Sequence, residues 1–139
     1  MIRYVLDTDH LTFAQRGYPL INARISATPP GEIAITIITA EEQLRGRFAQ
    51  IRRFPSGPAC VNAYHLLREA IDDMKTLPIL DFDTAAEAID QLLRKQKPQF
   101  HTQDRRIAAI ALANRCTLVT RNQIHFGQIP NLILEDWTK

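Results

Sequence analysis

Short, strongly apolar runs alternate with longer amphipathic segments along the whole chain. The runs are short and end at polar or turn residues, which predicts buried strands within residues 2–6, 33–38, 77–82, 117–120 and 131–135. Most of the segments between them have the three- and four-residue apolar spacing of helices. Parallel neighbouring strands need crossover connections, which are usually helical. The alternation therefore predicts a three-layer α/β/α domain with a central, mainly parallel sheet of four or five strands.

Two helix starts and one long helix follow from the same spacing. Thr39 with Glu42, and Thr84 with Glu87, have the separation of a capping box. A long helix is expected from residue 59, where one apolar stripe runs through Cys60, Tyr64, Leu67, Ile71 and Met74. Helices of this kind normally bury one face, so we expect this stripe to belong to the core.

Length and composition narrow the class of protein. The 139 residues suit a single domain, residues 1–139, of the commonest size. No apolar run approaches the roughly 18 residues of a membrane span, and no signal-like segment opens the chain. Cys60 and Cys116 are far apart and form no CxxC motif, which argues against a disulfide framework or a zinc site. We therefore expect a soluble, cytoplasmic domain with buried thiols and no membrane contact.

Polar side chains stand beside the carboxyl ends of three predicted strands. Asp7 ends the first, Glu42 lies in the helical turn after the second, Asp104 starts the helix that leads into the fourth, and Asn122 follows that strand. Ligands of parallel sheets bind outside these ends, so the four side chains converge if the strands are neighbours. Clustered carboxylates repel unless a cation compensates, and oxygen ligands favour Mg²⁺ or Mn²⁺.

Each of these residues also has a purely structural explanation. Glu42 could complete a capping box, and Asp7 could cap the helix that follows it. Asp104 is favoured by the dipole near a helix N-terminus, and Asn122 is a typical turn residue. Only their joint placement at the strand ends argues for a metal site.

Several segments in a fixed order carry a family resemblance. They read YVLDTD at 4–9, IITAEEQLRG at 37–46, DRRIAA at 104–109, LVTRN at 118–122, HF at 125–126 and EDW at 135–137. Together they resemble a PIN-domain ribonuclease of the VapC toxin type over essentially the whole chain. The resemblance implies a Mg²⁺-dependent endoribonuclease that hydrolyses RNA phosphodiesters with a metal-activated water. It also implies the toxin half of a toxin–antitoxin pair, usually a homodimer inhibited by a small antitoxin.

The resemblance assigns roles to individual residues. Asp7, Glu42 and Asp104 match the three acidic positions that hold the metal, and Gly46 stands at the family spacing from Glu42. Asn122 stands where a fourth, often acidic, catalytic residue is found, and it would orient a water without supplying charge. Supporting positions beside the site are expected for three further residues: Asp9, Thr39 and Thr120.

Contacts with RNA and with an antitoxin are also expected. Arg105, Arg106 and Arg121 lie near the acidic motifs and are candidates to bind phosphates, with plain surface solvation as the alternative. His10 and His125 are further candidate RNA contacts. Apolar residues of the early helices are candidates for the antitoxin groove or a dimer contact: Leu11, Phe13, Leu20 and Ile21. The antitoxin would bring a basic or aromatic peptide toward the acids.

Two other functions fit parts of the sequence. Asn122 in place of an acid is compatible with a catalytically silent PIN-like module that binds RNA or protein. The run Asp7-Thr8-Asp9 resembles the nucleophile motif of haloacid-dehalogenase-like phosphatases, in which Asp7 would be phosphorylated. Those enzymes need further acids at later strand ends, whereas Asp72 and Asp73 fall on a predicted helix.

The net charge of the chain does not by itself distinguish an RNA-cutting enzyme from the alternatives, but the distribution of charge bears on the question. The formal net charge is +2, from 17 basic and 15 acidic residues. If Asp7, Asp9, Glu42 and Asp104 gather in one cleft, the rest of the chain holds 11 acids against the 17 basic residues. An acidic pocket in a basic body is the distribution that a metal-dependent RNA-cutting domain needs.

Overall fold

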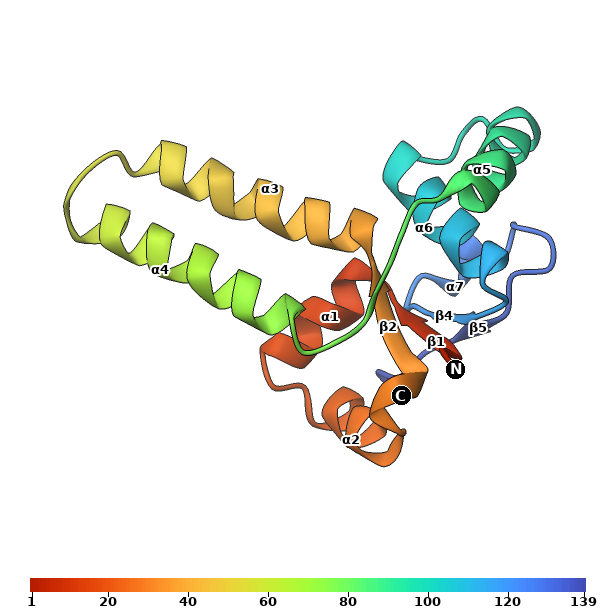
Figure 1. The fold of residues 1–139 in the computed structure, drawn as a ribbon, viewed down its shortest axis with the longest axis horizontal. Coiled ribbons are helices and arrows are strands. Elements are labelled where there is room, and N and C mark those ends of the chain that lie inside the picture. The colour runs from red at the N-terminus through yellow and green to blue at the C-terminus, as the bar shows by residue number, and fades with distance from the viewer.

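The computed structural model describes all 139 residues (Figure 1). Five short strands form one sheet: β1 (Tyr4–Leu6), β2 (Ile33–Thr36), β3 (Ile79–Leu80), β4 (Thr117–Val119) and β5 (Leu134–Glu135). The helices are α1 (Thr8–Gln15), α2 (Pro19–Ala27), α3 (Ile37–Arg53), α4 (Gly57–Met74), α5 (Thr84–Gln96), α6 (Thr102–Ala113) and α7 (Gln123–Phe126), with a 3₁₀ turn at Pro30–Glu32. All five predicted strand regions are confirmed, each with a shorter strand than the apolar run.

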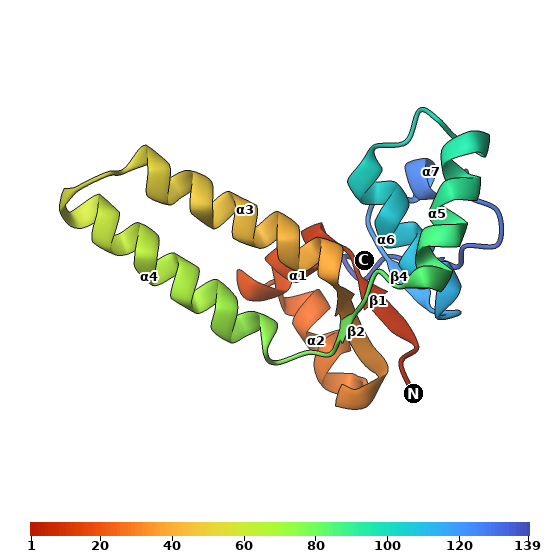
Figure 2. The same cartoon turned by 45° about the horizontal axis from the view of Figure 1, so that its top comes forward.

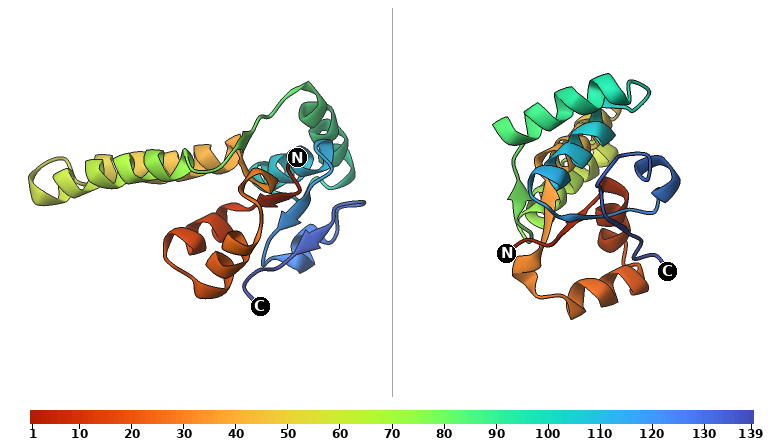
Figure 3. Two further views of the ribbon diagram at one scale, coloured as in Figure 1. Left: turned by 60° about the horizontal axis from the view of Figure 1, so that its bottom comes forward. Right: turned by 90° about the vertical axis from the view of Figure 1, so that its right-hand side faces the viewer.

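The strand order is β3-β2-β1-β4-β5, and every neighbouring pair is parallel. Successive side chains of a strand point to opposite faces, so Val5 and Leu6 enter two different cores. One core lies under α5 and α6, and the other lies against α1 and α2 (Figure 3). The sheet is thus covered on both faces, which confirms the three-layer α/β/α class. It also makes β1 the central strand, with β2 and β4 beside it.

Helices α3 and α4 form a long hairpin that extends away from the sheet (Figures 1 and 2). The expectation that the apolar stripe of α4 is core is wrong for Tyr64 and Ile71, which are 56% and 37% exposed. Met74 is buried as expected, and Cys60 and Leu67 are half-buried. The buried residues of α4 are Ala63, Ala70 and Met74. The outer part of α4 has α3 as its main packing partner, so only a narrow face lined by small side chains is buried.

The helix starts differ from the capping-box predictions by a few residues. The N-cap of α3 is Thr36, whose hydroxyl accepts a 3.1 Å hydrogen bond from the backbone N of Thr39. The N-cap of α5 is Asp83, which accepts from the backbone N of Ala86 at 2.9 Å. In both helices a residue that precedes the predicted cap in the chain has extended backbone, and its side chain accepts a hydrogen bond from a free N–H group of the first turn. Glu42 is therefore not needed to cap a helix.

The remaining sequence expectations concern thiols and membranes. Cys60 and Cys116 are both free, and Cys116 is buried whereas Cys60 is half-buried. Burial raises the pKa of the Cys116 thiol. None of the helices combines the length and the apolar character needed to cross a membrane.

Candidate active site

A pocket of about 160 Å³ opens where β1, β2 and β4 end. Its lining brings together all four residues predicted to be catalytic, along with four neighbours: Asp7, Thr8, Asp9, Glu42, Asp104, Ile107, Asn122 and Phe126. The convergence follows from the sheet order, because β2, β1 and β4 are adjacent and parallel.

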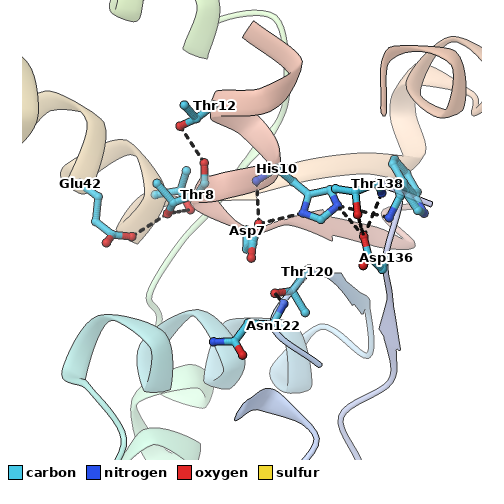
Figure 4. Close-up of polar contacts among 11 residues, drawn as sticks. Asp7, Thr8, His10, Thr12, Glu42, Thr120, Asn122, Asp136 and Thr138 are labelled. Atoms are coloured by element: carbon cyan, nitrogen blue, oxygen red, sulfur yellow. Dashed lines mark hydrogen bonds and ion pairs between the residues drawn. The ribbon is translucent and has the colours of Figure 1, made fainter. Parts of the chain in front are cut away.

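Asp7 follows β1 directly and is only 7% exposed. It is the N-cap of α1, and its Oδ1 accepts from the backbone N of His10 at 2.8 Å. The same oxygen lies 3.2 Å from Nδ1 of the His10 ring (Figure 4). The capping explanation of Asp7 is therefore confirmed, yet the residue also lines the pocket, and its Oδ2 accepts no hydrogen bond within the chain.

Glu42 enters the pocket from the second turn of α3. Its Oε1 accepts a 2.6 Å hydrogen bond from Thr8, whose hydroxyl also lies 3.1 Å from that of Thr39 (Figure 4). Burial raises the pKa of Glu42, the Thr8 hydrogen bond opposes this, and the nearby acids Asp104 and Asp9 raise the pKa further. The neighbouring Glu41 points elsewhere, because it accepts from Gln103 at 2.9 Å.

Asp9 lies in the first turn of α1 and lines the pocket without capping the helix. Burial raises its pKa, as do the charges of Asp7 and Asp104, while Arg121 acts in the opposite direction. The charged forms of Asp9 and Glu42 are therefore both less favoured than that of a carboxylate in water. The carboxylates surround the pocket without converging on one point, since no three acidic, histidine or cysteine side chains lie close enough together to hold one ion.

Asp104 and Asn122 complete the pocket from the β4 side. Asp104 lies in the first turn of α6, and its Oδ2 is 3.3 Å from Nε2 of His125, within ion-pair range but without hydrogen-bond alignment. The His125 ring stacks on Phe100 with centroids 4.1 Å apart. The backbone N of Asn122 donates to the buried Thr120 hydroxyl at 3.1 Å, while its side-chain amide has no partner within the chain.

Comparison with known proteins shows which proteins the chain resembles. No protein-family model matches the chain. Ribonuclease VapC1 from Haemophilus influenzae (strain R2866) is 28% identical over 138 residues, covering 98% of each chain. Ribonuclease VapC2 from Rickettsia felis is 39% identical over 70 residues, 48% of this chain and 52% of that one. A chain in the crystal structure of DNA-bound VapBC from Salmonella typhimurium superposes with a TM-score of 0.81 at 25% identity, over 99% of both chains. The chain is therefore similar, over essentially its whole length, to VapC-type proteins.

The three arginines expected to contact phosphates have three different environments. Arg105 is 7% exposed and its Nε donates to Asp90 at 2.6 Å, so the expectation that it contacts phosphates is wrong. Successive residues of a helix point about 100° apart, so Arg105 and Arg106 face different sides of α6. Arg105 points toward α5, where it donates to Asp90. Arg106 is half-buried over the ring of Phe82. Arg121 is exposed, lies over the ring of Phe13 and lowers the pKa of Asp9, so its charge reaches one residue of the pocket lining.

Three further polar residues near the pocket are fully buried: Thr39, Thr120 and His10. Thr39 and Thr120 are fully buried beside the pocket, as expected for side chains that hold others in place. His10 is also fully buried, so the expectation that it contacts RNA is wrong. Its three-residue separation from Asp7 places the two on one helix face, which is the only local signal of their contact. The C-terminal residues that cover it could not be found from spacing.

Proposed function

We propose that the chain is a metal-dependent endoribonuclease and the toxin of a toxin–antitoxin pair. The observation that carries this proposal is that Asp7, Glu42 and Asp104 line one pocket at the ends of three adjacent strands. The family supports it as well, since two relatives of this chain are named ribonucleases.

Mg²⁺, with Mn²⁺ as a substitute, is the cofactor that suits these residues. The lining offers carboxylate, hydroxyl and amide oxygens and no thiol or imidazole, which is the donor set of a hard cation. Burial and the neighbouring acids raise the pKa of Asp9 and Glu42, and a bound cation would oppose this effect. When bound, such an ion would offset the carboxylate charge and lower the pKa of a bound water, so that its deprotonated form could attack a phosphodiester.

The side chains in and near the pocket would bind the cation, orient a water and bind a phosphate. Because the three carboxylates do not converge on one point, Asp7, Glu42 and Asp104 would hold the cation partly through water molecules that it retains. His10 would orient Asp7, and Thr8 would orient Glu42. Asn122 has a free amide that can orient a water or a ribose oxygen. Arg121 would bind a phosphate near the pocket, a contact that is independent of RNA sequence. Attack in line would expel the 3′ oxygen of the cleaved linkage.

The direct test uses the purified, partner-free protein and a mixed cellular RNA pool with Mg²⁺ or Mn²⁺. We expect cleavage by the natural chain, and its loss in Asp7→Asn and Asp104→Asn variants that keep their circular dichroism spectra. Glu41→Gln is the matched control, since Glu41 neighbours Glu42 but bonds to Gln103 outside the pocket. Intact RNA under both metals would refute the enzymatic function. RNA binding that ignores Asp7 would instead indicate a silent binding module.

The phosphatase alternative gains nothing from the structure. Its mechanism needs an acidic pair at the end of a later strand, for which Asp72 and Asp73 are the candidates. Asp72 and Asp73 lie in the last turn of α4, as predicted, and neither lines the pocket that contains Asp7.

We further propose that a small antitoxin inhibits the chain, and that the free chain is a homodimer. Two of the matched structures of other proteins are VapBC complexes. Among the candidate contact residues, Leu20 is 54% exposed and suits this role. Leu11 and Ile21 are buried in the core, so the expectation that they form an exposed contact is wrong. Co-expression with the small gene beside this one should yield a complex without ribonuclease activity, and separate purification of the two proteins would contradict the proposal.

A further inference from the structure

A fully buried histidine connects the acidic pocket to the C-terminal segment (Figure 4). Nδ1 of His10 lies 3.2 Å from Oδ1 of Asp7. On the opposite side of the ring, the backbone N of Trp137 donates to Nε2 at 3.2 Å. The imidazole thus joins two segments that are 127 positions apart in the chain.

The contact with Trp137 determines which ring nitrogen carries the proton. A backbone N–H can only donate, so Nε2 must offer its lone pair. In a neutral imidazole the proton then belongs to Nδ1, which donates it to Asp7. Asp136 is the other group near Nε2. Its Oδ1 lies 3.7 Å away, within ion-pair range but beyond hydrogen-bond distance, and it accepts from the backbone N and the hydroxyl of Thr138 at 2.9 Å and 2.5 Å.

The Trp137 amide is itself held firmly. The Trp137 side chain is fully buried, its ring packs edge-on against Tyr4 at 5.2 Å, and its Nε1 donates to Glu135 at 3.1 Å. The guanidinium of Arg24 covers the indole at 4.9 Å. Because this segment is anchored at both ring and backbone, the donor that faces His10 has little freedom to turn away.

One oxygen of Asp7, Oδ1, accepts two hydrogen bonds from His10. Oδ1 accepts both from the backbone N of His10, at 2.8 Å, and from the His10 ring. Two donors on one oxygen restrict rotation of the carboxylate and leave Oδ2 free to face the pocket. Hydrogen bonds of this kind orient metal-binding carboxylates and are costly to remove.

We propose that His10 is a positioning residue: held as the Nδ1–H tautomer by the Trp137 amide, it orients Asp7 for cation binding and RNA cleavage. The catalytic part rests on the proposed function, whereas the tautomer does not.

The tautomer is tested directly on the full-length protein with ¹⁵N-labelled histidine, without metal, near neutral pH. Long-range ¹⁵N–¹H spectra should show one histidine with a protonated Nδ1 and an unprotonated Nε2, and this signal should vanish in His10→Asn. The exposed His65 provides the comparison of a ring in solvent. A protonated Nε2 on His10, alone or as imidazolium, would overturn the proposal.

The positioning role is tested with two substitutions. His10→Leu fills the space without a donor, whereas the amide of His10→Asn can take the place of Nδ1. We expect His10→Leu to lower both kcat and the Mn²⁺ affinity measured by calorimetry by about 10- to 100-fold, with KM for RNA little changed. His10→Asn should recover most of both losses.

A purely structural role predicts a different result. Both variants would then melt at lower temperature, but the kcat of the folded fraction would be unchanged, and Asn would rescue nothing. That result would overturn the proposal, and so would unchanged Mn²⁺ affinity in folded His10→Leu. If the natural chain cleaves no RNA, the proposed function fails, while the tautomer and the Mn²⁺ affinities still test the role of His10.

Discussion

Thr8 donates a 2.6 Å hydrogen bond from its hydroxyl to Oε1 of Glu42, which joins the first turn of α1 to α3. Both residues line the acidic pocket. The bond favours the charged form of Glu42 and so opposes the effect of burial on its pKa. The position and the charge of Glu42 therefore both depend on a residue next to Asp7.

Replacing Thr8 by Val should raise the pKa of Glu42, because the carboxylate loses its donor. The acidic limb of the pH profile of RNA cleavage should move to higher pH, and Mn²⁺ should bind more weakly. The profile of kcat/KM measures the first effect and calorimetry the second. Thr12→Val is the control, since Thr12 bonds to the backbone O of Thr8 and lies outside this pocket. An acidic limb that stays in place would contradict the assigned role of Thr8.

Replacing Glu42 by Gln should stabilise the metal-free protein at neutral pH. The pKa of Glu42 is raised in the fold, so its contribution to the free energy of unfolding is present below pH 4.5 and is lost as pH rises through the higher folded value. Removing the charge removes that loss. Thermal melting at several pH values should show a higher midpoint for the variant at pH 7, and a smaller increase on addition of Mg²⁺.

Glu41→Gln provides a matched test of opposite sign. The hydrogen bond from Gln103 lowers the pKa of Glu41, so this residue contributes stability above pH 4.5 that is lost as pH falls through the lower folded value. Its variant should melt slightly lower than the natural chain at neutral pH. The effect is small because the side chain is exposed. Equal shifts in the same direction for both variants would refute the assignment.

Arg105 and Asp90 form a buried ion pair that connects α6 to α5. Arg105→Met leaves the carboxylate of Asp90 buried and unpaired, which should lower the free energy of unfolding by about 3–5 kcal/mol. Adding Asp90→Leu should restore much of this loss. Urea unfolding measures both effects. The exposed Arg94→Met on α5 should change stability by less than about 0.5 kcal/mol, and an equal loss there would show that burial is not the cause.

Gly46 lies inside α3, and a Cβ added there would meet nothing within 4 Å. Gly46→Ala should therefore stabilise the protein by about 1 kcal/mol through the better helix propensity of alanine. Gly127 is the contrasting position, because its Cβ would lie 2.6 Å from the backbone O of Gln123. Gly127→Ala should destabilise the protein. Urea unfolding of the two variants compares them, and a loss of stability in Gly46→Ala would contradict this account.

Local spacing was sufficient to predict where the acidic residues would meet. Asp7 ends a short apolar run, and the turns after two other runs contain Glu42 and Asn122. Parallel strands then bring such positions to one edge of the sheet. The structure confirms this because β1 lies between β2 and β4.

The buried faces of helices were harder to predict. Spacing correctly showed that α4 has an apolar stripe, but the stripe that is buried runs through Ala63, Ala70 and Met74, because α4 packs against α3 rather than under a full layer. Arg105 and Arg106 are chemically alike and adjacent in sequence. Only the packing of α6 on α5 directs Arg105 to Asp90.

The sequence by itself determined the alternation of strands and helices and the placement of acids at strand ends, because both depend on residues a few positions apart. The tertiary structure alone decided which polar side chains leave water. His10 is buried because Trp137 and its neighbours cover it from the far end of the chain. Burial depends on contacts between distant segments, so no local pattern could have shown that this histidine supports Asp7 and does not bind RNA.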